Sequence, residues 1–296
     1  MPPPPHYYGW QPSPPDQRDL LYAPNRLLGL PAFIDLTEPV EIANLPPFSP
    51  AYDQGALGSC GPNAVAGALA YDMLFESKWG NPPLPPMPSR LYVYWFARFL
   101  MGTTAYDSGV NNRSMLKALN QYGWCDEGLR PYTISEFAQR PSDECLAQAK
   151  SRRITSYLSV AQDLGVMKAC LAVDRKPIVY GFTVYDSFET SEALRTGVVP
   201  MPKASDGVLG GHDVLLVGYD DTRAAFRFRN SWGEDYGERG YGWMPYAYAT
   251  NPGLSGDFWT IRGSGFTPPA PPSVPALLVL NRDMVKGVYT LTPYKP

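Results

Sequence analysis

The chain has 296 residues, of which 44% are hydrophobic, so its length and composition allow a large folded core. Its 25 basic and 28 acidic side chains give a net charge of −3, which lacks the strong basic excess of a nucleic-acid-binding protein. The sequence has no run of about eighteen apolar residues that would predict a membrane-spanning helix.

Residues 1–30 form the first segment and are rich in proline and tyrosine. This composition favours an extended backbone and cannot build a core of its own. The opening residues, MPPPPHYYGW, lack the basic start and the apolar stretch of a secretory signal. We therefore expect a protein that is either cytoplasmic or exported without a recognisable signal.

The next informative block is YDQGALGSCGPNAVAGALAYDMLF, in which Val65, Leu69 and Met73 recur at helical spacing. Pro62 suits the first turn of a helix, where its missing N–H costs nothing. Cys60 is therefore expected at a helix N-terminus, whose partial positive charge favours a thiolate. A buried structural cysteine is the alternative interpretation, and this block alone does not separate the two.

The second block surrounds His212, which is the one histidine outside the proline-rich segment. GGHDVLLVGYDD predicts a strand, residues 220–222 a turn, and AAFRFRNSWG a second strand with alternating Phe and Arg. A hairpin that turns about residue 221 would place His212 directly opposite Asn230, although a bulge could shift this register. The amide oxygen of Asn230 could then hold the imidazole ring in one orientation. A core histidine bonded to a backbone carbonyl is the alternative.

The chain divides into residues 1–30, a folded body at 31–262 and a C-terminal extension at 263–296. The extension begins with GSGFTPPAPPSVP, a linker by composition. Two short apolar runs that flank Asn281, Arg282 and Asp283 then predict a hairpin.

The blocks YDQGALGSCGPNA, GGHDVLLVGYD and FRNSWGEDYGERGYGWM are similar, in order and spacing, to those around the active site of papain-like cysteine peptidases. His212 follows Cys60 by 152 residues, close to the separation of about 130–150 residues typical of that family. Weaker similarity in PSRLYVYWFAR, DSGVNNRSMLKALNQYGWCDEGLRPY and PIVYGFTVYDSF extends the resemblance over most of residues 31–262. The blocks are most similar to compact bacterial members.

The resemblance implies catalytic roles for four residues. Cys60 would attack the peptide carbonyl as a thiolate paired with imidazolium His212, and a thioester acyl-enzyme would follow. Asn230 would hold the ring, shielded from water by the indole of Trp232. Gln54 would donate its side-chain amide to the oxyanion together with the backbone N–H of Cys60.

Four further positions are expected to bind substrate. Ser108 and Gly109 match the loop whose backbone pairs with an extended substrate, and the carbonyl of Gly211 would accept a substrate N–H. Gly58, in the turn before Cys60, allows close approach of the substrate backbone. The expected partner is thus a peptide or protein, with no nucleic acid, no membrane, no metal and no cofactor.

The fold that the resemblance implies is α+β with two lobes. A helical lobe would begin with the helix of Cys60, and a lobe built on an antiparallel sheet or barrel would carry His212 and Asn230. The active-site cleft would lie between the lobes.

The sequence departs from the family pattern at four positions near the catalytic blocks. Leu57 replaces a disulfide cysteine, and Gly61 replaces the aromatic residue that usually follows the nucleophile. Asp213 stands where a small apolar residue usually follows the histidine, and Tyr236 replaces a tryptophan. None of these changes removes a catalytic group, and the effect of Asp213 on the histidine is left open.

Two other functions are compatible with these motifs. An amine could resolve the acyl-enzyme, which would make the protein a transpeptidase, or the chain could be a peptide-binding homologue that does not cut. Residues 1–30 could form a short pro-segment over the cleft, since Tyr7, Tyr8 and Trp10 supply apolar area and the prolines pre-extend the chain. A disordered tail is the alternative for this segment.

Overall fold

The computed structural model of the protein describes residues 6–25, 27–37, 50–77, 85–266, 278–283 and 288–293. Its helices are α2 (Cys60–Ser77), α3 (Arg90–Met101), α4 (Asn112–Tyr122), α5 (Asp143–Ala149), α6 (Leu164–Ala172), α7 (Ser191–Thr196) and α8 (Tyr246–Ala249), with short 3-10 turns η1 (Ile134–Glu136) and η2 (Asp186–Glu189). Its strands are β1 (Phe33–Asp35), β2 (Ser156–Ser159), β3 (Ile178–Tyr185), β4 (Val208–Asp220), β5 (Ala225–Arg229), β6 (Tyr241–Pro245), β7 (Ser255–Arg262), β8 (Leu278–Asp283) and β9 (Val288–Pro293).

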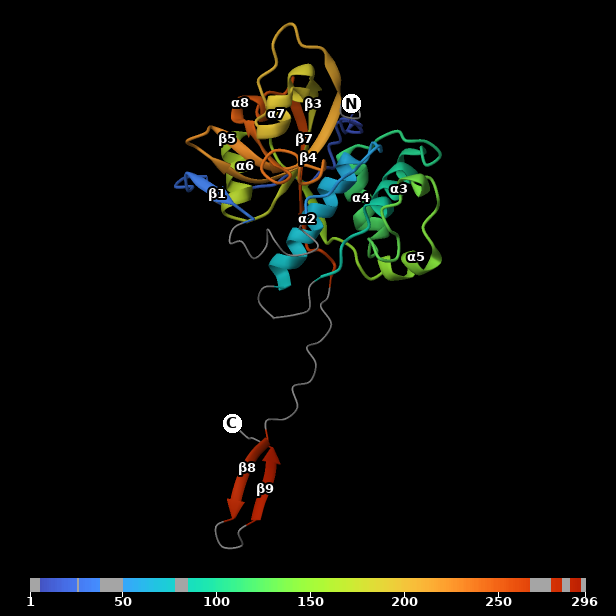
Figure 1. Ribbon diagram of the computed structural model, residues 1–296, viewed down its shortest axis with the longest axis vertical. Helices are drawn as coiled ribbons and strands as arrows, with labels where there is room; N and C mark the ends of the chain where they lie inside the picture. Colours follow the sequence, from blue (N-terminus) through green and yellow to red (C-terminus); the bar gives the residue numbers. More distant parts are fainter. Residues whose placement is uncertain are drawn as a thin grey trace.

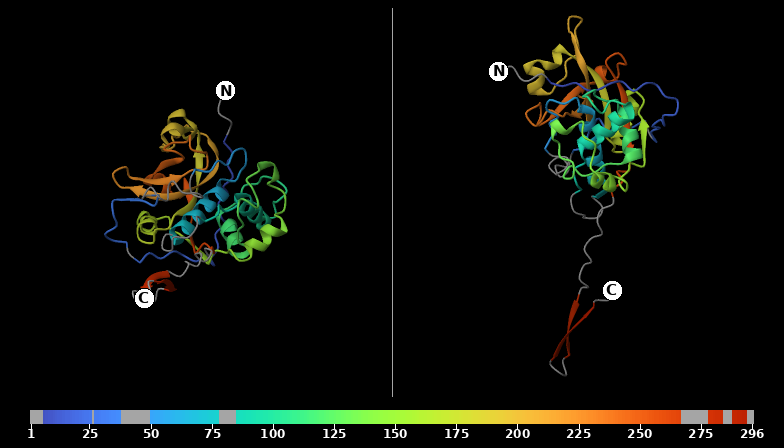
Figure 2. Two further views of the ribbon diagram at one scale, coloured as in Figure 1. Left: turned by 60° about the horizontal axis from the view of Figure 1, so that its bottom comes forward. Right: turned by 90° about the vertical axis from the view of Figure 1, so that its right-hand side faces the viewer.

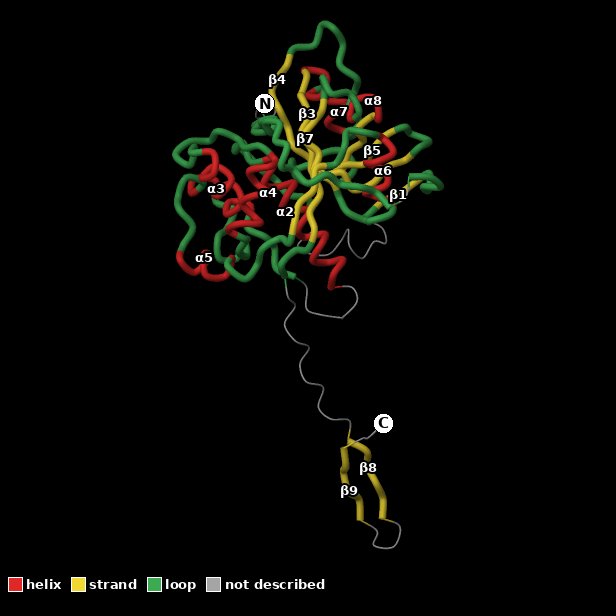
Figure 3. Tube along the Cα trace, turned by 180° about the vertical axis from the view of Figure 1, so that it is seen from behind, coloured by secondary structure: helices red, strands yellow, loops and turns green. Residues whose placement is uncertain are grey.

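Strands β1 to β7 form one antiparallel sheet, with the order β2-β7-β3-β4-β5-β6 and with β1 also paired to β4. The long strand β4 is central and pairs with β3, so that Phe182 lies opposite His212. Figures 1 and 3 show α3, α4 and α5 together on one side of α2 and the strands on the other. The predicted α+β class is confirmed by this arrangement.

Helix α2 is apolar on every side because it lies between the two halves of the molecule. It packs against β4 on one side and against α3 and α4 on the other. All residues from Cys60 to Leu74 are buried, which accounts for a sequence with no polar face. A helix in this position fixes its first residue, Cys60, against the sheet that carries His212.

The loop between α3 and α4 is held at both ends by helix caps. Gly102 ends α3 in the left-handed conformation, with φ of 73°, which glycine adopts at no steric cost. Asn111 begins α4 by accepting a hydrogen bond from the backbone N–H of Ser114. The intervening residues, which include Ser108 and Gly109, therefore have a defined position, beside residues 9–11 of the N-terminal segment.

The register predicted for the β4–β5 hairpin was wrong by two residues at the site. Leu215 pairs with Arg229, so by continuation of the ladder Asn230 lies opposite Val214 rather than His212. The turn occupies residues 221–224, further along the chain than predicted. His212 and Asn230 are diagonal neighbours on one face of the sheet, because alternate residues of a strand point to the same side.

An irregularity in β4 brings these two side chains to the same face. The ladder shifts between Leu216 and Gly218, which leaves Val217 as an extra residue. If the register near the turn continued without this shift, Asn230 would lie opposite Leu215 and would share its face with Asp213. The bulge, which the sequence analysis allowed for but did not place, therefore presents His212 to Asn230.

The C-terminal extension forms the predicted hairpin, β8 with β9. The turn was placed wrongly, because Asn281, Arg282 and Asp283 belong to β8. Within the described part of the chain these two strands pair only with each other.

The N-terminal segment lies on the body over much of its described length. Trp10 forms a bridge with Val110, and Leu21 forms one with Ser159. Tyr22 is buried in the main core. Figure 2 shows this segment, in blue, passing across the molecule from the N-terminus.

Candidate active site

Cys60 is the first residue of α2, and its side chain is fully buried. The backbone of Asp213, Gly9 and Gly61 lies near its sulfur and lowers the pKa of the thiol. Burial and the nearby Asp213 carboxyl have the larger effect, and the pKa of Cys60 is raised to about 12. The thiol therefore lies next to the residue that follows His212.

His212 is also fully buried, and its ring is oriented by Asn230. The Nε2 atom of His212 lies 2.8 Å from Oδ1 of Asn230, while the Nδ1 atom is buried without a hydrogen-bond partner. The indole of Trp232 covers the ring with a centroid separation of 4.9 Å. The Nδ1 atom is thus the free position of the ring from which a proton can be taken or given.

Burial favours the neutral form of both Cys60 and His212. It lowers the pKa of His212 to about 4, although the hydrogen bond that the ring donates to Asn230 opposes this shift. Together with the raised pKa of Cys60, this favours a neutral thiol and a neutral imidazole in the structure as it stands.

Gln54 is fixed by three partners in the turn before α2. Its Oε1 accepts a hydrogen bond from the hydroxyl of Ser231, and its Nε2 donates to the carbonyl oxygen of Leu57. The same Nε2 donates to the carbonyl oxygen of Tyr7, at 2.8 Å. An amide group that was predicted to bind a substrate oxygen therefore already holds a peptide oxygen.

Other residues of the N-terminal segment occupy the remaining predicted substrate positions. The backbone N–H of Trp10 donates to the carbonyl oxygen of Gly211, at 2.9 Å. The side chain of Gln11 donates to the carbonyl oxygen of Ser108, at 2.6 Å.

Gly9 lies between Gly58 and Gly109, in close contact with the backbone of both. A Cβ atom on Gly9 would lie 1.9 Å from the carbonyl oxygen of Gly58, and a Cβ atom on Gly109 would lie 2.1 Å from that of Gly9. Val110 donates its backbone N–H to the carbonyl oxygen of Gly9, at 2.8 Å. The three glycines thus allow backbone to touch backbone beside Cys60.

His6 and Tyr8 attach the start of the segment to η2. The ring of His6 stacks on Trp232 with a centroid separation of 3.8 Å. The Nδ1 atom of His6 lies 2.9 Å from the carboxylate of Glu189, which also accepts a hydrogen bond from the hydroxyl of Tyr8. Tyr8 also lies edge-on to His212, with a centroid separation of 6.0 Å.

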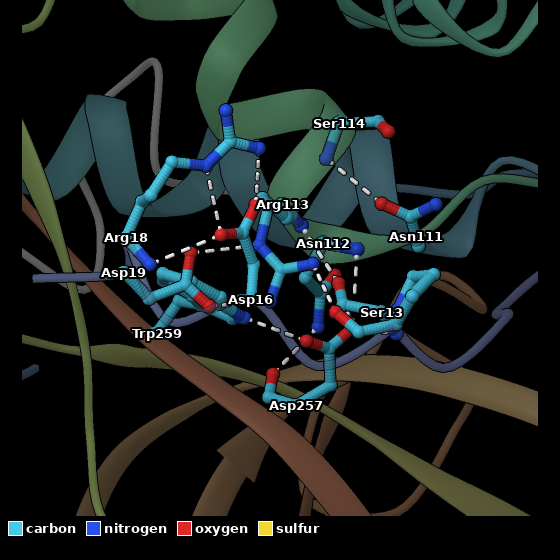
Figure 4. A network of polar contacts seen from close by, with 11 residues as sticks. Ser13, Asp16, Arg18, Asp19, Asn111, Asn112, Arg113, Ser114, Asp257 and Trp259 are labelled. Carbon is cyan, nitrogen blue, oxygen red and sulfur yellow. Dashed lines mark hydrogen bonds and ion pairs between the residues drawn. The ribbon is translucent and has the colours of Figure 1, made fainter.

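A second anchor holds the segment further along, as Figure 4 shows. Oδ2 of Asp257 accepts hydrogen bonds from the hydroxyl of Ser13, at 2.9 Å, and from the backbone N–H of Asn112, at 3.2 Å. Arg113 donates to the carboxylate of Asp19 and to the carbonyl oxygen of Pro14. The segment is therefore attached by polar groups at both ends of the groove.

Sequence reasoning identified the residues on the groove floor but missed those that hold the segment. Asp257 has a left-handed backbone with φ of 61°, an uncommon conformation for a non-glycine residue. Neither this conformation nor the pairing of Glu189 with His6 has a local sequence signal, because each depends on residues distant along the chain.

In the part of the chain that the structure describes, no group of three or more His, Cys, Asp or Glu side chains could hold a metal ion. Likewise, none of the described helices is long and apolar enough to cross a membrane.

Comparisons with known proteins give a consistent result. The family model described as "Papain family cysteine protease" matches residues 101–256. A peptidase C1-like protein of Acanthamoeba polyphaga mimivirus is 33% identical over 272 residues, which cover 86% of each chain. Xylellain, a cysteine protease from Xylella fastidiosa, is 40% identical, with a TM-score of 0.78 over 86% of this chain and 96% of its own. A procathepsin B from Trypanosoma congolense shares the fold at 18% identity, with a TM-score of 0.64 over 87% of this chain and 86% of its own.

Proposed function

Because this chain belongs to the papain family of cysteine proteases, we propose that it is an endopeptidase whose nucleophile is Cys60 and whose base is His212. The chain is a hydrolase of the thiol-protease type. The proposal assigns the chemistry to named residues and the substrate to an extended peptide.

In the proposed reaction the thiol proton of Cys60 passes to the free Nδ1 atom of His212. The thiolate attacks the carbonyl carbon of the peptide bond, and Gln54 and the backbone N–H of Cys60 stabilise the oxyanion. His212 then gives its proton to the leaving amine, which leaves a thioester on Cys60. Water hydrolyses the thioester, and Asn230 keeps the ring aligned throughout.

One observation supports this assignment above all others. Residues 7–11 place peptide groups against the predicted substrate-binding atoms, with the carbonyl of Tyr7 at Gln54 and the N–H of Trp10 at Gly211. The groove therefore fits a peptide backbone, and its polar groups have the donor and acceptor roles that a peptide requires.

The decisive experiment is product analysis by mass spectrometry. Incubation of the full chain with a panel of acyl-dipeptide fluorogenic substrates and a denatured protein should give products that carry water at the new carboxyl group. An epoxide thiol inhibitor should stop the reaction. Products that carry an added amine instead would identify a transpeptidase, and binding without cleavage would identify a peptide-binding homologue.

We further propose that residues 6–22, here called the cover, inhibit the site in the manner of a short pro-segment. The cover follows the groove in the order Gln54, Gly109, Gly211, as the hydrogen bonds of Tyr7 and Trp10 and the close approach of Gly9 indicate. Read from its N-terminus to its C-terminus, a substrate would contact Gly109 and Gly211 before Gln54. The cover therefore runs in the opposite direction. Gly9 of this reversed backbone lies near Cys60, and the reversed direction would protect the cover from cleavage.

The cover would also act on the charge state of the pair. Exclusion of water lowers the pKa of His212 and raises that of Cys60, so that proton transfer between them becomes unfavourable. Departure of the cover would admit water and favour the ion pair. Blockage of the groove and suppression of the thiolate would thus have the same cause.

A further inference from the structure

Asp213 has no role in the reaction described above, although it lies beside both residues of the pair. It follows His212 in β4 and is 1% exposed. Its Oδ1 atom accepts a hydrogen bond from the side-chain amide of Asn112, at 3.0 Å. Its Oδ2 atom is buried without a hydrogen-bond partner. A carboxyl group in the interior with a single neutral partner is costly when it is charged.

The position of this carboxyl is directly against the first turn of α2. A Cβ atom on Gly61 would lie 2.7 Å from Oδ2 of Asp213. The missing side chain at position 61 therefore provides space for the acid at position 213 and for Met115, whose Cε atom would lie 2.5 Å from the same Cβ. The two departures from the family pattern next to the catalytic residues are complementary in space, which indicates that they belong together.

The groups around this carboxyl come from several elements. The titratable groups that face it are Cys60 on α2, Tyr180 on β3 and Asp257 on β7. Burial and the charge of Asp257 raise the pKa of Asp213 well above its ordinary value of 3.8, against a smaller opposing effect of Asn112. The same carboxyl raises the pKa of Cys60, second only to burial. Because the negative charges of Asp213 and Cys60 repel each other, these two groups titrate as a coupled pair.

We propose that Asp213 is a positioning residue that controls the nucleophile through charge: as a neutral acid it allows the thiolate of Cys60 to form, and as a carboxylate it suppresses it. The proton stays on Oδ2, because Oδ1 accepts the hydrogen bond from Asn112. Asp213 exchanges no atom with substrate. This proposal rests on the proposed role of Cys60 as nucleophile.

The consequence is an alkaline limit on the active form of the enzyme. As pH rises, ionisation of Asp213 would add a negative charge beside the sulfur, and the thiolate would then form only at still higher pH. Asp213→Asn keeps the acceptor for Asn112 and removes the charge at every pH.

The test measures thiolate formation in the full chain by ultraviolet absorbance near 240 nm as a function of pH. The signal of Cys60 is the difference between each protein and its Cys60→Ala counterpart, because the chain has three other cysteines. Asp213→Asn should lower the midpoint of this signal by about one pH unit or more, the size of effect expected from a nearby like charge. Asp220→Asn, at the far end of the same strand, serves as the matched control and should leave the midpoint unchanged.

Asp213→Ala provides a second variant without the charge, and it should shift the midpoint in the same direction. A purely structural role would change thermal stability in either variant but would not lower the midpoint. An unchanged midpoint in both folded variants would overturn the proposal for Asp213. Persistence of the wild-type signal in Cys60→Ala would instead overturn the assignment of the nucleophile.

Discussion

The groove floor and the cover are held in place by different kinds of interaction. The floor is formed by α2 and β4, and Cys60 and His212 are fully buried in it. The cover is attached by backbone hydrogen bonds and by polar anchors at Glu189, Asp257 and Arg113. Apolar packing depends little on pH and salt, whereas ion pairs and carboxylate hydrogen bonds depend on both. The proposed catalytic residues can therefore stay in place while the cover is released.

The first prediction concerns substitution of Cys60 and His212 in the groove floor and has the largest expected effect. His212→Ala should reduce kcat/KM as much as Cys60→Ala does, by at least about a thousandfold, because nucleophile and base act as a unit. Cys145→Ala, which alters another buried cysteine, is the matched control and should retain activity. Fluorogenic peptide assays on variants with wild-type circular dichroism provide the measurement. Near-normal turnover by folded Cys60→Ala would refute the mechanism.

The second prediction separates supporting residues from the pair. Gln54→Ala should lower kcat by about a hundredfold to a thousandfold, since it removes one oxyanion donor. Asn230→Ala should also leave measurable activity, because the ring keeps its contacts with Trp232 and Phe182. Steady-state kinetics would distinguish these variants from His212→Ala. A kinetically silent Gln54→Ala would show that its assigned role is wrong.

The third prediction releases the cover without altering the floor. Gly9→Val in the full chain should raise kcat/KM toward small peptides by about tenfold, which corresponds to ~1.4 kcal/mol, because its side chain would collide with the carbonyl of Gly58. A chain that begins at Pro31 should also gain activity, and added N-terminal peptide should inhibit it.

Leu20→Ala is the control for this release, because the Leu20 side chain lies in the cover but is 62% exposed. Its kinetics should match those of the wild type. Equal activity of Gly9→Val, the shortened chain and the wild type, all equally stable, would exclude an inhibitory cover.

The fourth prediction concerns acid release of the cover and has the smallest effect. Burial alone would raise the pKa of Glu189, but the hydrogen bonds from His6 and Tyr8 outweigh it, so the pKa lies below its ordinary value of 4.5. The carboxylate therefore stabilises the covered form above about pH 4.5, and this contribution is lost as pH falls through the lowered pKa. The activity ratio of Gly9→Val to wild type should decline about twofold to threefold across that range.

The use of a ratio removes the pH dependence of the proposed catalytic pair in the uncovered form, which is the same in both proteins. Glu189→Gln should flatten the ratio, because it cannot ionise. If the activity ratio of Gly9→Val to wild type, with Glu189 unchanged in both, were constant from pH 6 to pH 3.5, this role of Glu189 would be contradicted.

Local patterns in the sequence were sufficient to place the groove floor. The helix at Cys60, the strand of His212 and the second strand before Asn230 were all predicted from apolar spacing, and the structure has each of them. These elements have strong periodicity because one or both of their faces are buried. The family and its α+β fold followed from three blocks in order, and they are confirmed.

The register at the site and the anchors of the cover were not predictable in this way. Pairing between strands depends on the bulge at Val217, for which Gly218 inside the strand is a local signal that does not specify a register. The contacts of Asp257 with Ser13 and of His6 with Glu189 join residues far apart in the chain. Roles for individual site residues stay predictions until the variants above are measured.

The bulge at Val217 also means that changes in the length of the turn do not alter the positions of the proposed catalytic residues. It lies between the turn at residues 221–224 and the part of β4 that contains His212. Insertions at the turn leave the pairing of Leu215 with Arg229 intact, while loss or gain of one residue at the bulge exchanges the faces of His212 and Asp213. We therefore expect homologous chains to vary in length at this turn but not between the histidine and the bulge, which an alignment of relatives would check.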